Sequence, residues 1–297
     1  MSVPPTEERN PDTVHIDRLS TLDMVRLINA EDQKVAPAVA AVLPAIAAAA
    51  ELAVAALRGG RRLHYFGAGT SGRMAMLDAA ELYPTFGAGP DQVVAHLAGG
   101  LSALHTAVEG AEDDADLGAA AAAETGAGDV ALGVAASGAT PYVRGALRAA
   151  RTAGAGTVLL TANPAAPLAE LADVVIAVDT GPEAITGSTR MKAGTAQKMV
   201  LNTLSTAVMV RLGRTYSNLM TDMVASNRKL RDRQVRMLVQ ATGLDVTRCA
   251  AALAEAGGEP KAALVALLAQ TPPAAARAAL SRTGGVVHAA LRELHAT

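Results

Sequence analysis

The hydrophobic positions of the chain divide it into a helical start, an alternating middle part and a helical end. In the middle part, short apolar runs rich in Val and Leu alternate with longer Ala-rich segments of helical spacing. Strands that are apolar on both faces and separated by helices predict a parallel sheet covered on both sides. The strand-like runs are Leu63–Phe66, Val93–Leu97, Asp129–Ala135, Gly156–Thr161 and Asp173–Val178, and the helical stretches between them are Gly72–Leu82, Leu101–Val108, Asp113–Ala123 and Tyr142–Ala153.

Helical patterns flank this middle part. Residues 1–12 are polar and contain Pro, which predicts a mobile tail. Helices are expected over Leu22–Asn29 and from Val35 to the Gly59-Gly60 stop, and again over Lys198–Leu212 and Asp222–Val239.

The end of the chain, beyond Ala241, is rich in Ala and Leu and is broken at Gly257-Gly258, Pro272-Pro273 and Gly284-Gly285. This pattern predicts three short helices in a small bundle. The expected fold class is α/β, a three-layer sandwich of a parallel sheet between helices, with a C-terminal helical bundle. The expected boundaries are 1–54 for the tail and first helices, 55–218 for the α/β domain and 219–297 for the C-terminal region.

Three loops rich in Ser, Thr and Gly follow predicted strands: Gly67–Gly72, Ala136–Pro141 and Glu183–Arg190. Because ligands of parallel sheets bind at the carboxyl ends of the strands, these loops are expected to meet at one edge. Glycines let the backbone approach a ligand, and hydroxyl and N–H groups hold phosphate oxygens without a metal. The sequence therefore predicts an anion site, although each loop alone also fits an ordinary turn with a helix cap.

The first loop does not match a nucleotide site well. No Gly-Lys-Ser/Thr sequence follows its glycines, which disfavours nucleotide hydrolysis. Its glycines have the G-x-G-x-x-G spacing of a dinucleotide fingerprint, but Asp91, about twenty residues further on, does not end a second strand.

Two acids, Glu81 and Glu112, are candidates for proton transfer. Glu81 closes the helical pattern that begins at the first loop, and Glu112 lies near the start of a later helix. Two carboxylates near one anion site divide acid and base roles when their environments differ, but solvated surface charges fit the same spacing.

The segment from Thr189 to Lys198 places basic residues at a helix start, where they oppose the helix dipole. A bound anion, an acid or a surface ion pair is expected to offset them.

Composition narrows the function further. The formal net charge of −2 leaves no basic surface for nucleic acid or a membrane. The single cysteine, Cys249, excludes an internal disulfide and is expected to be a buried apolar residue. The six His residues show no metal-ligand spacing, so no metal is expected. The N-terminus does not have the pattern of a signal peptide, and a cytoplasmic protein is expected.

Several motifs together resemble a known family. Phe66–Arg73 resembles the first loop of the sugar isomerase (SIS) domain, and Leu77–Glu81 with Pro84–Gly87 is similar to the N-acetylmuramic acid 6-phosphate etherase family. The similarity covers nearly the whole chain, from Ile16 to the C-terminal helices. Its other motifs are Glu109–Asp113, Ala136–Tyr142, Glu183–Lys198 and Tyr216–Met220.

The resemblance implies an SIS-type fold and a homodimer with its site near the subunit interface. It implies cleavage of the D-lactyl ether of N-acetylmuramic acid 6-phosphate to N-acetylglucosamine 6-phosphate and D-lactate, without a metal or organic cofactor. Glu81 is the implied proton donor and Glu112 the second acid/base residue. The implied substrate-binding residues are Gly69, Thr70, Ser71, Ser137, Thr140, Glu183, Ser188, Thr189 and Lys192, of which Ser71, Ser137, Ser188 and Thr189 hold the phosphate.

Elementary chemistry agrees with two acid/base groups. The C3 ether is β to the aldehyde of the ring-opened sugar, so loss of the C2 proton gives an enolate-like species that expels lactate. The lactyl oxygen leaves well only when an acid protonates it, and water then adds at C3. The 6-phosphate serves to position C2 and C3. Which carboxylate takes the C2 proton stays open.

Two other functions remain open at this point. An aldose–ketose isomerase of the same fold also abstracts a C2 proton, but it has no use for an acid at a leaving group. A non-catalytic sugar-phosphate sensor, such as the vertebrate glucokinase regulatory protein, shares the fold but is much longer and has duplicated SIS domains.

Overall fold

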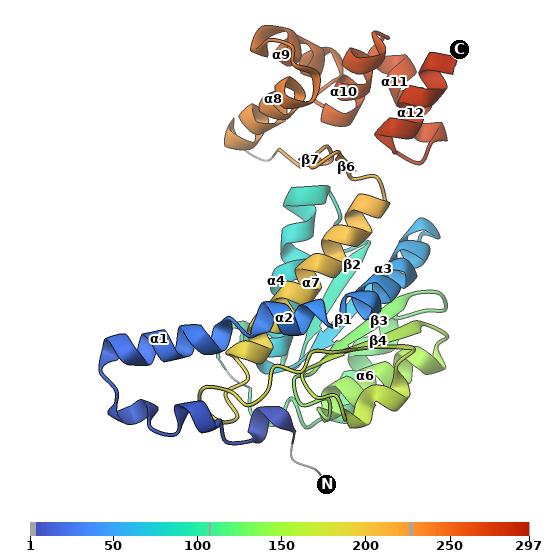
Figure 1. Ribbon diagram of the computed structural model, residues 1–297. Coiled ribbons are helices and arrows are strands. Elements are labelled where there is room, and N and C mark those ends of the chain that lie inside the picture. The colour runs from blue at the N-terminus through green and yellow to red at the C-terminus, as the bar shows by residue number, and fades with distance from the viewer. Residues whose placement is uncertain (1–3, 107, 226–227, 297) are drawn as a thin grey trace. The chain divides into compact units, whose positions relative to one another are not determined.

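The computed structural model describes residues 4–106, 108–225 and 228–296. The chain forms two compact units, one of residues 1–80 and 90–205 and the other of residues 81–89 and 206–297. Figure 1 shows the helices and strands of both units and labels most of them.

The first unit is built on a five-stranded parallel sheet with the strand order β2-β1-β3-β4-β5. Gly67, the last residue of β1, pairs with Leu97 of β2 and Val134 of β3, so these strands end level at one edge. Every residue of β1 and β3 is buried, as their continuous apolar character predicts. All five expected strands are confirmed: β1 (Leu63–Gly67), β2 (Val93–Leu97), β3 (Val130–Val134), β4 (Gly156–Thr161) and β5 (Val174–Ala177).

Helices cover both faces of the sheet, which confirms the three-layer architecture (Figure 1). On one face, α5 (Ala115–Ala121) and α6 (Pro141–Thr152) pack together, and a Cβ on Gly133 of β3 would touch α6. On the other face, α3 (Leu43–Arg58) contacts β1, β3 and β5.

Buried Asp78 joins the elements of this second face. It lies on α4 (Gly69–Phe86) and accepts hydrogen bonds from the Tyr65 hydroxyl of β1 at 3.1 Å and from two side chains of α7 (Lys192–Arg211). These are the Asn202 amide at 2.6 Å and the Ser205 hydroxyl at 3.0 Å. Burial raises the pKa of Asp78, against the effect of these bonds. Asp78 therefore fixes α4 and α7 to β1.

Two helix predictions in this unit were wrong. The Ala-rich segment forms two helices, α2 (Val35–Ala40) and α3, because Pro44 lies in the first turn of α3, where its fixed φ favours a new helix start. The expected helix over Leu101–Val108 is only a short 3₁₀ helix, Gly100–Leu104, because Gly99 and Gly100 both have positive φ. Residue 107 lies outside the described residues.

The expectation of a mobile N-terminal tail was also wrong for the described residues 4–12. Residues 4–18 contain three 3₁₀ helices, Pro5–Glu7, Pro11–Thr13 and Ile16–Arg18, followed by α1 (Thr21–Asp32). The Thr6 carbonyl accepts the Gly187 N–H at 3.0 Å, and the Asn10 amide donates to Pro182 and Glu31. The polar residues of this segment thus bond to the folded chain, which orders it.

The second unit contains a short hairpin and a bundle of helices. The hairpin pairs β6 (Thr215–Tyr216) with β7 (Leu219–Met220), and its turn contains Ser217 with a positive φ. The bundle consists of α8 (Arg228–Thr242), α9 (Val246–Glu255), α10 (Pro260–Ala269), α11 (Pro273–Arg282) and α12 (Val287–Ala296).

Four helices rather than the expected three follow residue 241, because each of the three Gly or Pro dipeptides separates two helices. Cys249 is buried in the bundle core, as predicted. The helix expected over Asp222–Val239 begins only at Arg228, and its residues 226 and 227 lie outside the described residues.

Within the described residues, no single helix has the length and apolar character needed to cross a membrane. Two bent pairs of helices, Thr21–Ala40 with Leu43–Arg58 and Pro260–Ala269 with Pro273–Arg282, meet that criterion only when taken together.

A pair of histidines links β1 to the edge strand β2. His64 Nδ1 lies 3.1 Å from His96 Nε2, and the His96 ring stacks on Phe66 with the ring centroids 4.5 Å apart. Burial, together with the neighbouring His64, lowers the pKa of His96 from 6.5 to about 4. The folded protein therefore keeps His96 neutral under conditions in which an unfolded chain protonates it.

We expect stability to fall as the pH decreases from 6.5 to about 4, because the unfolded chain then binds a proton that folded His96 does not. His96→Phe keeps a ring beside Phe66 and removes this titration, so its free energy of unfolding will depend less on pH over this range. Urea unfolding of both proteins across the range measures the difference. An unchanged pH dependence in the variant contradicts the expectation.

Candidate active site

The first loop turns sharply from β1 into α4. A Cβ on Gly67 would lie 2.7 Å from the Gly72 Cα, so the two residues approach too closely for any side chain at either position. Gly69 has a φ of +53° and begins α4, followed by Thr70. Ser71 is 8% exposed. The N–H groups of this first helical turn have no acceptor within the helix and are therefore suited to bind an anion.

The second loop leads from β3 into α6. Gly138 has a φ of +65°, and the Ser137 hydroxyl accepts the Ala139 N–H at 3.2 Å. The Asn163 amide donates to the Ser137 carbonyl at 2.9 Å and fixes this residue from the end of β4. Thr140 directly precedes α6, but its side chain makes no capping bond, so its hydroxyl is free to bind another group.

Two buried charged residues, Glu183 and Lys192, fix the third loop and the start of α7. Glu183 is completely buried, and its carboxylate accepts the N–H groups of Lys192 and Ala193 at the start of α7, both at 2.9 Å. Burial raises the pKa of Glu183. Ser188 and Thr189 are half-buried between these anchors.

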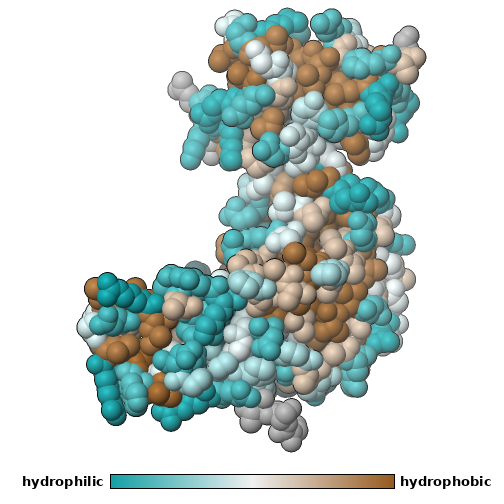
Figure 2. All heavy atoms as spheres, in the orientation of Figure 1, coloured by the Kyte–Doolittle hydropathy of each residue, from teal (hydrophilic) through white to brown (hydrophobic). Residues whose placement is uncertain are grey.

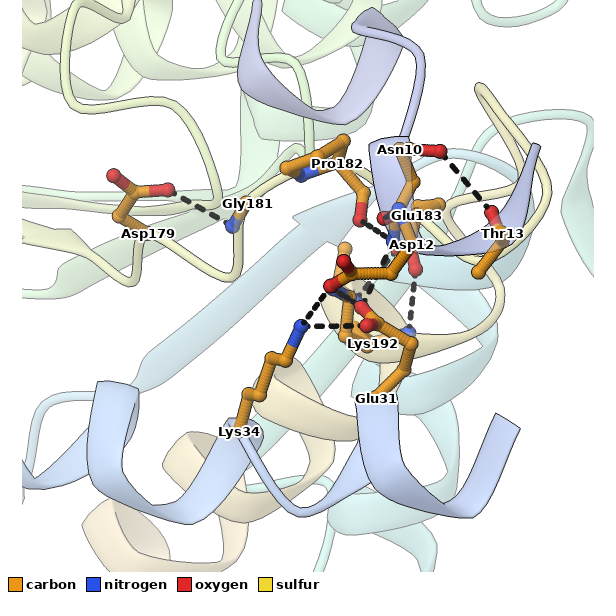
Figure 3. Close-up of polar contacts among 11 residues, drawn as sticks. Asn10, Asp12, Thr13, Glu31, Lys34, Asp179, Gly181, Pro182, Glu183 and Lys192 are labelled. Carbon is orange, nitrogen blue, oxygen red and sulfur yellow. Dashed lines mark hydrogen bonds and ion pairs between the residues drawn. The ribbon is translucent and has the colours of Figure 1, made fainter. Parts of the chain in front are cut away.

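The Lys192 ammonium belongs to a polar cluster that includes the N-terminal segment (Figure 3). Lys192 is 1% exposed, and its Nζ lies 2.5 Å from Glu31 Oε2. Glu31, which is 2% exposed, also accepts from Lys34 Nζ at 2.5 Å and from the Asn10 amide at 2.9 Å. Burial opposes ionisation of Glu31, but Lys192, Lys34 and Asn10 outweigh it and lower its pKa.

Lys192 is thus compensated by an acid, one of the alternatives left open by the sequence. Glu31 was not identified from the sequence, because it lies far along the chain from Lys192 and no local pattern connects the two. Its own neighbours, Glu31-Asp32-Gln33-Lys34, look like an ordinary solvated helix end.

The three loops lie together at the carboxyl edge of the sheet, as expected. A Cβ on Gly194 of α7 would come within 3.3 Å of Thr70 Cγ2, which connects the third loop with the first. Ala136, Ala162 and Ala193 form a small apolar cluster that connects the second loop with the start of α7.

A cavity of about 330 Å³ opens beside the first loop and brings Gly69 together with Glu112. Glu112 is exposed there, and its carbonyl accepts the Tyr142 N–H of α6 at 3.0 Å. A Cβ on Gly118 of α5 would lie 1.9 Å from the Tyr142 carbonyl oxygen, so only glycine allows this contact. The cavity lining comprises Ala68, Gly69, Arg73, Ala98, Ala103, Val108, Glu109, Gly110, Ala111, Glu112 and Asp113.

Of the eleven predicted site residues, two line this cavity, Gly69 and Glu112, and the other nine do not. The charged groups of Glu183 and Lys192 bond to other protein groups. Glu81 is an exposed residue of α4, ten residues after Ser71, and belongs to the second unit, whereas Glu112 belongs to the first. The catalytic and substrate-binding roles of all these residues stay predictions.

A larger cavity of about 710 Å³ lies in the second unit and is lined in part by Asp222, Arg231, Lys261 and Arg277. Lys261 Nζ is bonded there to Asp222 at 2.5 Å and to the Gly213 carbonyl at 2.9 Å. Size alone does not identify a catalytic site, and no residue of this cavity was predicted to bind substrate. No group of three or more His, Cys, Asp or Glu side chains within the described ranges is arranged to hold a metal ion.

Comparison with known proteins shows close relatives over almost the whole chain. The chain is 61% identical to an N-acetylmuramic acid 6-phosphate etherase of Thermobifida fusca, over 89% of this chain and 87% of that protein. It is 51% identical to the enzyme of that name from Cutibacterium acnes, over 98% of this chain and 96% of the relative. The family model described as the glucokinase regulatory protein N-terminal SIS domain matches residues 45–151.

Solved structures support the fold. A phosphoheptose isomerase of Francisella tularensis is similar, with a TM-score of 0.53 and 21% identity, over 65% of this chain and 100% of that chain. A phosphoheptose isomerase from Neisseria gonorrhoeae gives a TM-score of 0.51 and 20% identity, over 64% of this chain and 99% of that chain. The sheet with its helices is therefore an SIS-type fold, as the sequence motifs indicated.

Glu31→Gln will leave the Lys192 ammonium buried without its negative partner. We expect the free energy of unfolding to fall by about 3–5 kcal/mol, since a buried charge without its partner is strongly destabilising. Lys34→Gln is the matched control, because Lys34 contacts the same carboxylate but is 51% exposed, and we expect it to cost about 0–1 kcal/mol. Chemical denaturation at neutral pH measures both, and similar losses for the two variants contradict the expectation.

Proposed function

This chain belongs to the N-acetylmuramic acid 6-phosphate etherase family, and from that premise we propose that it cleaves the D-lactyl ether of N-acetylmuramic acid 6-phosphate. The products are N-acetylglucosamine 6-phosphate and D-lactate, and the reaction belongs to the recycling of cell-wall amino sugars. The observation that carries this proposal is 51% identity over 98% of the chain to a relative of that name.

We propose that the hydroxyl loops hold the sugar phosphate. The phosphate oxygens would accept hydrogen bonds from the hydroxyl groups of Ser71, Ser137, Ser188 and Thr189. The rest of the binding site would consist of Gly69, Thr70 and Thr140. The close approach of Gly194 to Thr70 and the cluster of Ala136, Ala162 and Ala193 support this arrangement, because they connect the start of α7, directly after the third loop, with the first and second loops. Glu183 would act indirectly, by fixing the third loop to the start of α7. Lys192 would do so by fixing the start of α7 to Glu31 of α1.

The proposed chemistry requires one group that removes the C2 proton and one that protonates the lactyl oxygen. Glu112 is a candidate for one role because it lines the cavity that begins at Gly69. Glu81 is the candidate for the other, as a proton donor, on the basis of the family motif Leu77–Glu81.

The alternatives have weaker support. The two phosphoheptose isomerases share only 20–21% identity with this chain, which supports a common fold and not a common reaction. The match to the regulatory protein domain covers only residues 45–151, whereas the etherases from Thermobifida fusca and Cutibacterium acnes match 89% and 98% of the chain.

We further propose that the protein is a cytoplasmic homodimer. Helix α1 supports the dimer, because Leu22 is 58% exposed and Val25 is 57% exposed, three residues apart on one side of the helix. Figure 2 shows hydrophobic side chains gathered over this helix. The boundaries at residues 54 and 218 likewise remain proposals.

Incubation with N-acetylmuramic acid 6-phosphate tests the activity. We expect the wild-type protein to release D-lactate, and we expect Glu81→Gln and Glu112→Gln each to lower kcat by about 100-fold or more, since general acid and base groups contribute on that order. Binding of N-acetylglucosamine 6-phosphate is expected to survive in both variants.

The matched control for this test is Glu109→Gln, which changes another acid of the same cavity and should retain activity. Ketose formation without lactate would indicate an isomerase, and binding without turnover would indicate a sensor. Wild-type turnover in Glu81→Gln would refute its proposed role.

A double substitution, Leu22→Ser with Val25→Ser, tests the dimer. We expect wild-type protein to have twice the mass of one chain in analytical ultracentrifugation and the double variant to shift to one chain, because the polar side chains remove the apolar contact. Val246→Ser is a control, since Val246 is 62% exposed at the start of α9. A dimer that is unaffected by the double substitution excludes α1 as its contact.

A further inference from the structure

The proposed substrate carries a second anion, which the hydroxyl loops do not account for. Its phosphate is at C6, whereas the lactyl group at C3 ends in a carboxylate. The sugar product lacks this carboxylate, because it leaves with D-lactate. A site that binds the carboxylate would therefore distinguish the substrate from the sugar product. This inference rests on the proposed function, because the lactyl carboxylate belongs to the proposed substrate.

The cavity that contains Glu112 is unfavourable for a carboxylate at first sight. Three acids, Glu109, Glu112 and Asp113, line it, and all three are exposed. A carboxylate that enters this cavity is repelled by them unless a cation is present. Arg73 is the one cation among the described residues that line the cavity.

Arg73 is fixed in position by hydrogen bonds to main-chain carbonyl groups. It lies on α4, one turn after Gly69, and both residues line the cavity. Its Nε donates to the carbonyl oxygens of Ala103 at 2.9 Å and Leu104 at 3.3 Å. Among the described residues, its two terminal amino groups have no protein partner.

A guanidinium held in this way is suited to a carboxylate. Its planar fork presents parallel N–H groups that match two carboxylate oxygens, and such charge-assisted pairs are stronger than neutral hydrogen bonds. Because Nε is already bonded to the backbone, little side-chain entropy remains to be lost on binding.

We propose that Arg73 binds the lactyl carboxylate of the substrate. This contact holds the C3–oxygen bond within the cavity that contains Glu112, and it is lost when D-lactate leaves. The contact gives the enzyme a preference for a 3-lactyl sugar phosphate over the same sugar phosphate with a free 3-hydroxyl.

The test compares two substrates and one product. Arg73→Gln is expected to lower kcat/KM for N-acetylmuramic acid 6-phosphate by about 100-fold, the loss of one strong charged contact. The methyl ester of its lactyl carboxylate has no such charge, so the wild-type protein and the variant should process it at rates within about 3-fold. The dissociation constant of N-acetylglucosamine 6-phosphate should likewise change by less than about 3-fold.

Two further variants complete the experiment. Arg148→Gln, on the exposed surface of α6, is the matched control and should leave all three measurements unchanged. Arg73→Lys keeps the charge without the fork and should lose about 10-fold, on the acid substrate only.

An equal loss on the acid and the ester overturns the inference, because Arg73 would then act only through Ala103 and Leu104. Wild-type kcat/KM in Arg73→Gln overturns it as well. If the wild-type protein itself releases no lactate, the proposed function fails, which is a separate outcome from either of these.

Discussion

The buried ion pair between Glu31 and Lys192 connects the N-terminal segment to the start of α7, directly after the third loop. Taking two charges out of water costs several kcal/mol each, and their attraction offsets this only when further hydrogen bonds satisfy the remaining atoms. Asn10 and Lys34 supply those bonds to Glu31 (Figure 3). The cluster therefore forms only when residues 4–34 and the third loop are both in place, and the position of Ser188 and Thr189 depends on it.

Helix α4 has a comparable role for the first loop. Gly67 and Gly72 allow the sharp turn, Gly69 and Thr70 begin the helix, and Asp78 fixes it to β1 and α7. Since α7 begins at Lys192, the Asp78 bonds also connect the first loop with the third. The Asp78 hydrogen bonds and the Glu31–Lys192 ion pair thus fix α4 and α7, the two helices that adjoin the first and third loops.

The sequence predicted those elements correctly that depend on neighbouring residues. Its predictions were wrong where the structure depends on contacts between residues far apart in the chain. Continuous apolar runs predicted the five strands, and parallel strands require their following loops to share an edge. The prediction of a helix from Leu101 was wrong because the positive φ values of Gly99 and Gly100 redirect the chain. The prediction of a mobile tail was wrong because the Asn10 side chain bonds to Glu31 and Pro182, which lie far along the chain. The motif predicted Glu112 as a site residue, and the structure places it in the cavity lining with Gly69. The sequence did not predict the bond between its carbonyl and the Tyr142 N–H, which depends on the packing of α5 against α6.

The distribution of charge in the first unit follows from a conflict within the proposed reaction. The reaction requires carboxyl groups beside a substrate that itself carries two anions, and a cation next to every anion would hold those carboxyl groups in the ionised form. Neutral hydroxyls and backbone N–H groups solve the problem for the phosphate, because they bind an anion without adding a positive charge. Lys192 does not violate this rule, since Glu31 neutralises it in the protein interior. Only the lactyl carboxylate, which must enter among Glu109, Glu112 and Asp113, requires a full positive charge, and Arg73 is where the cavity provides one.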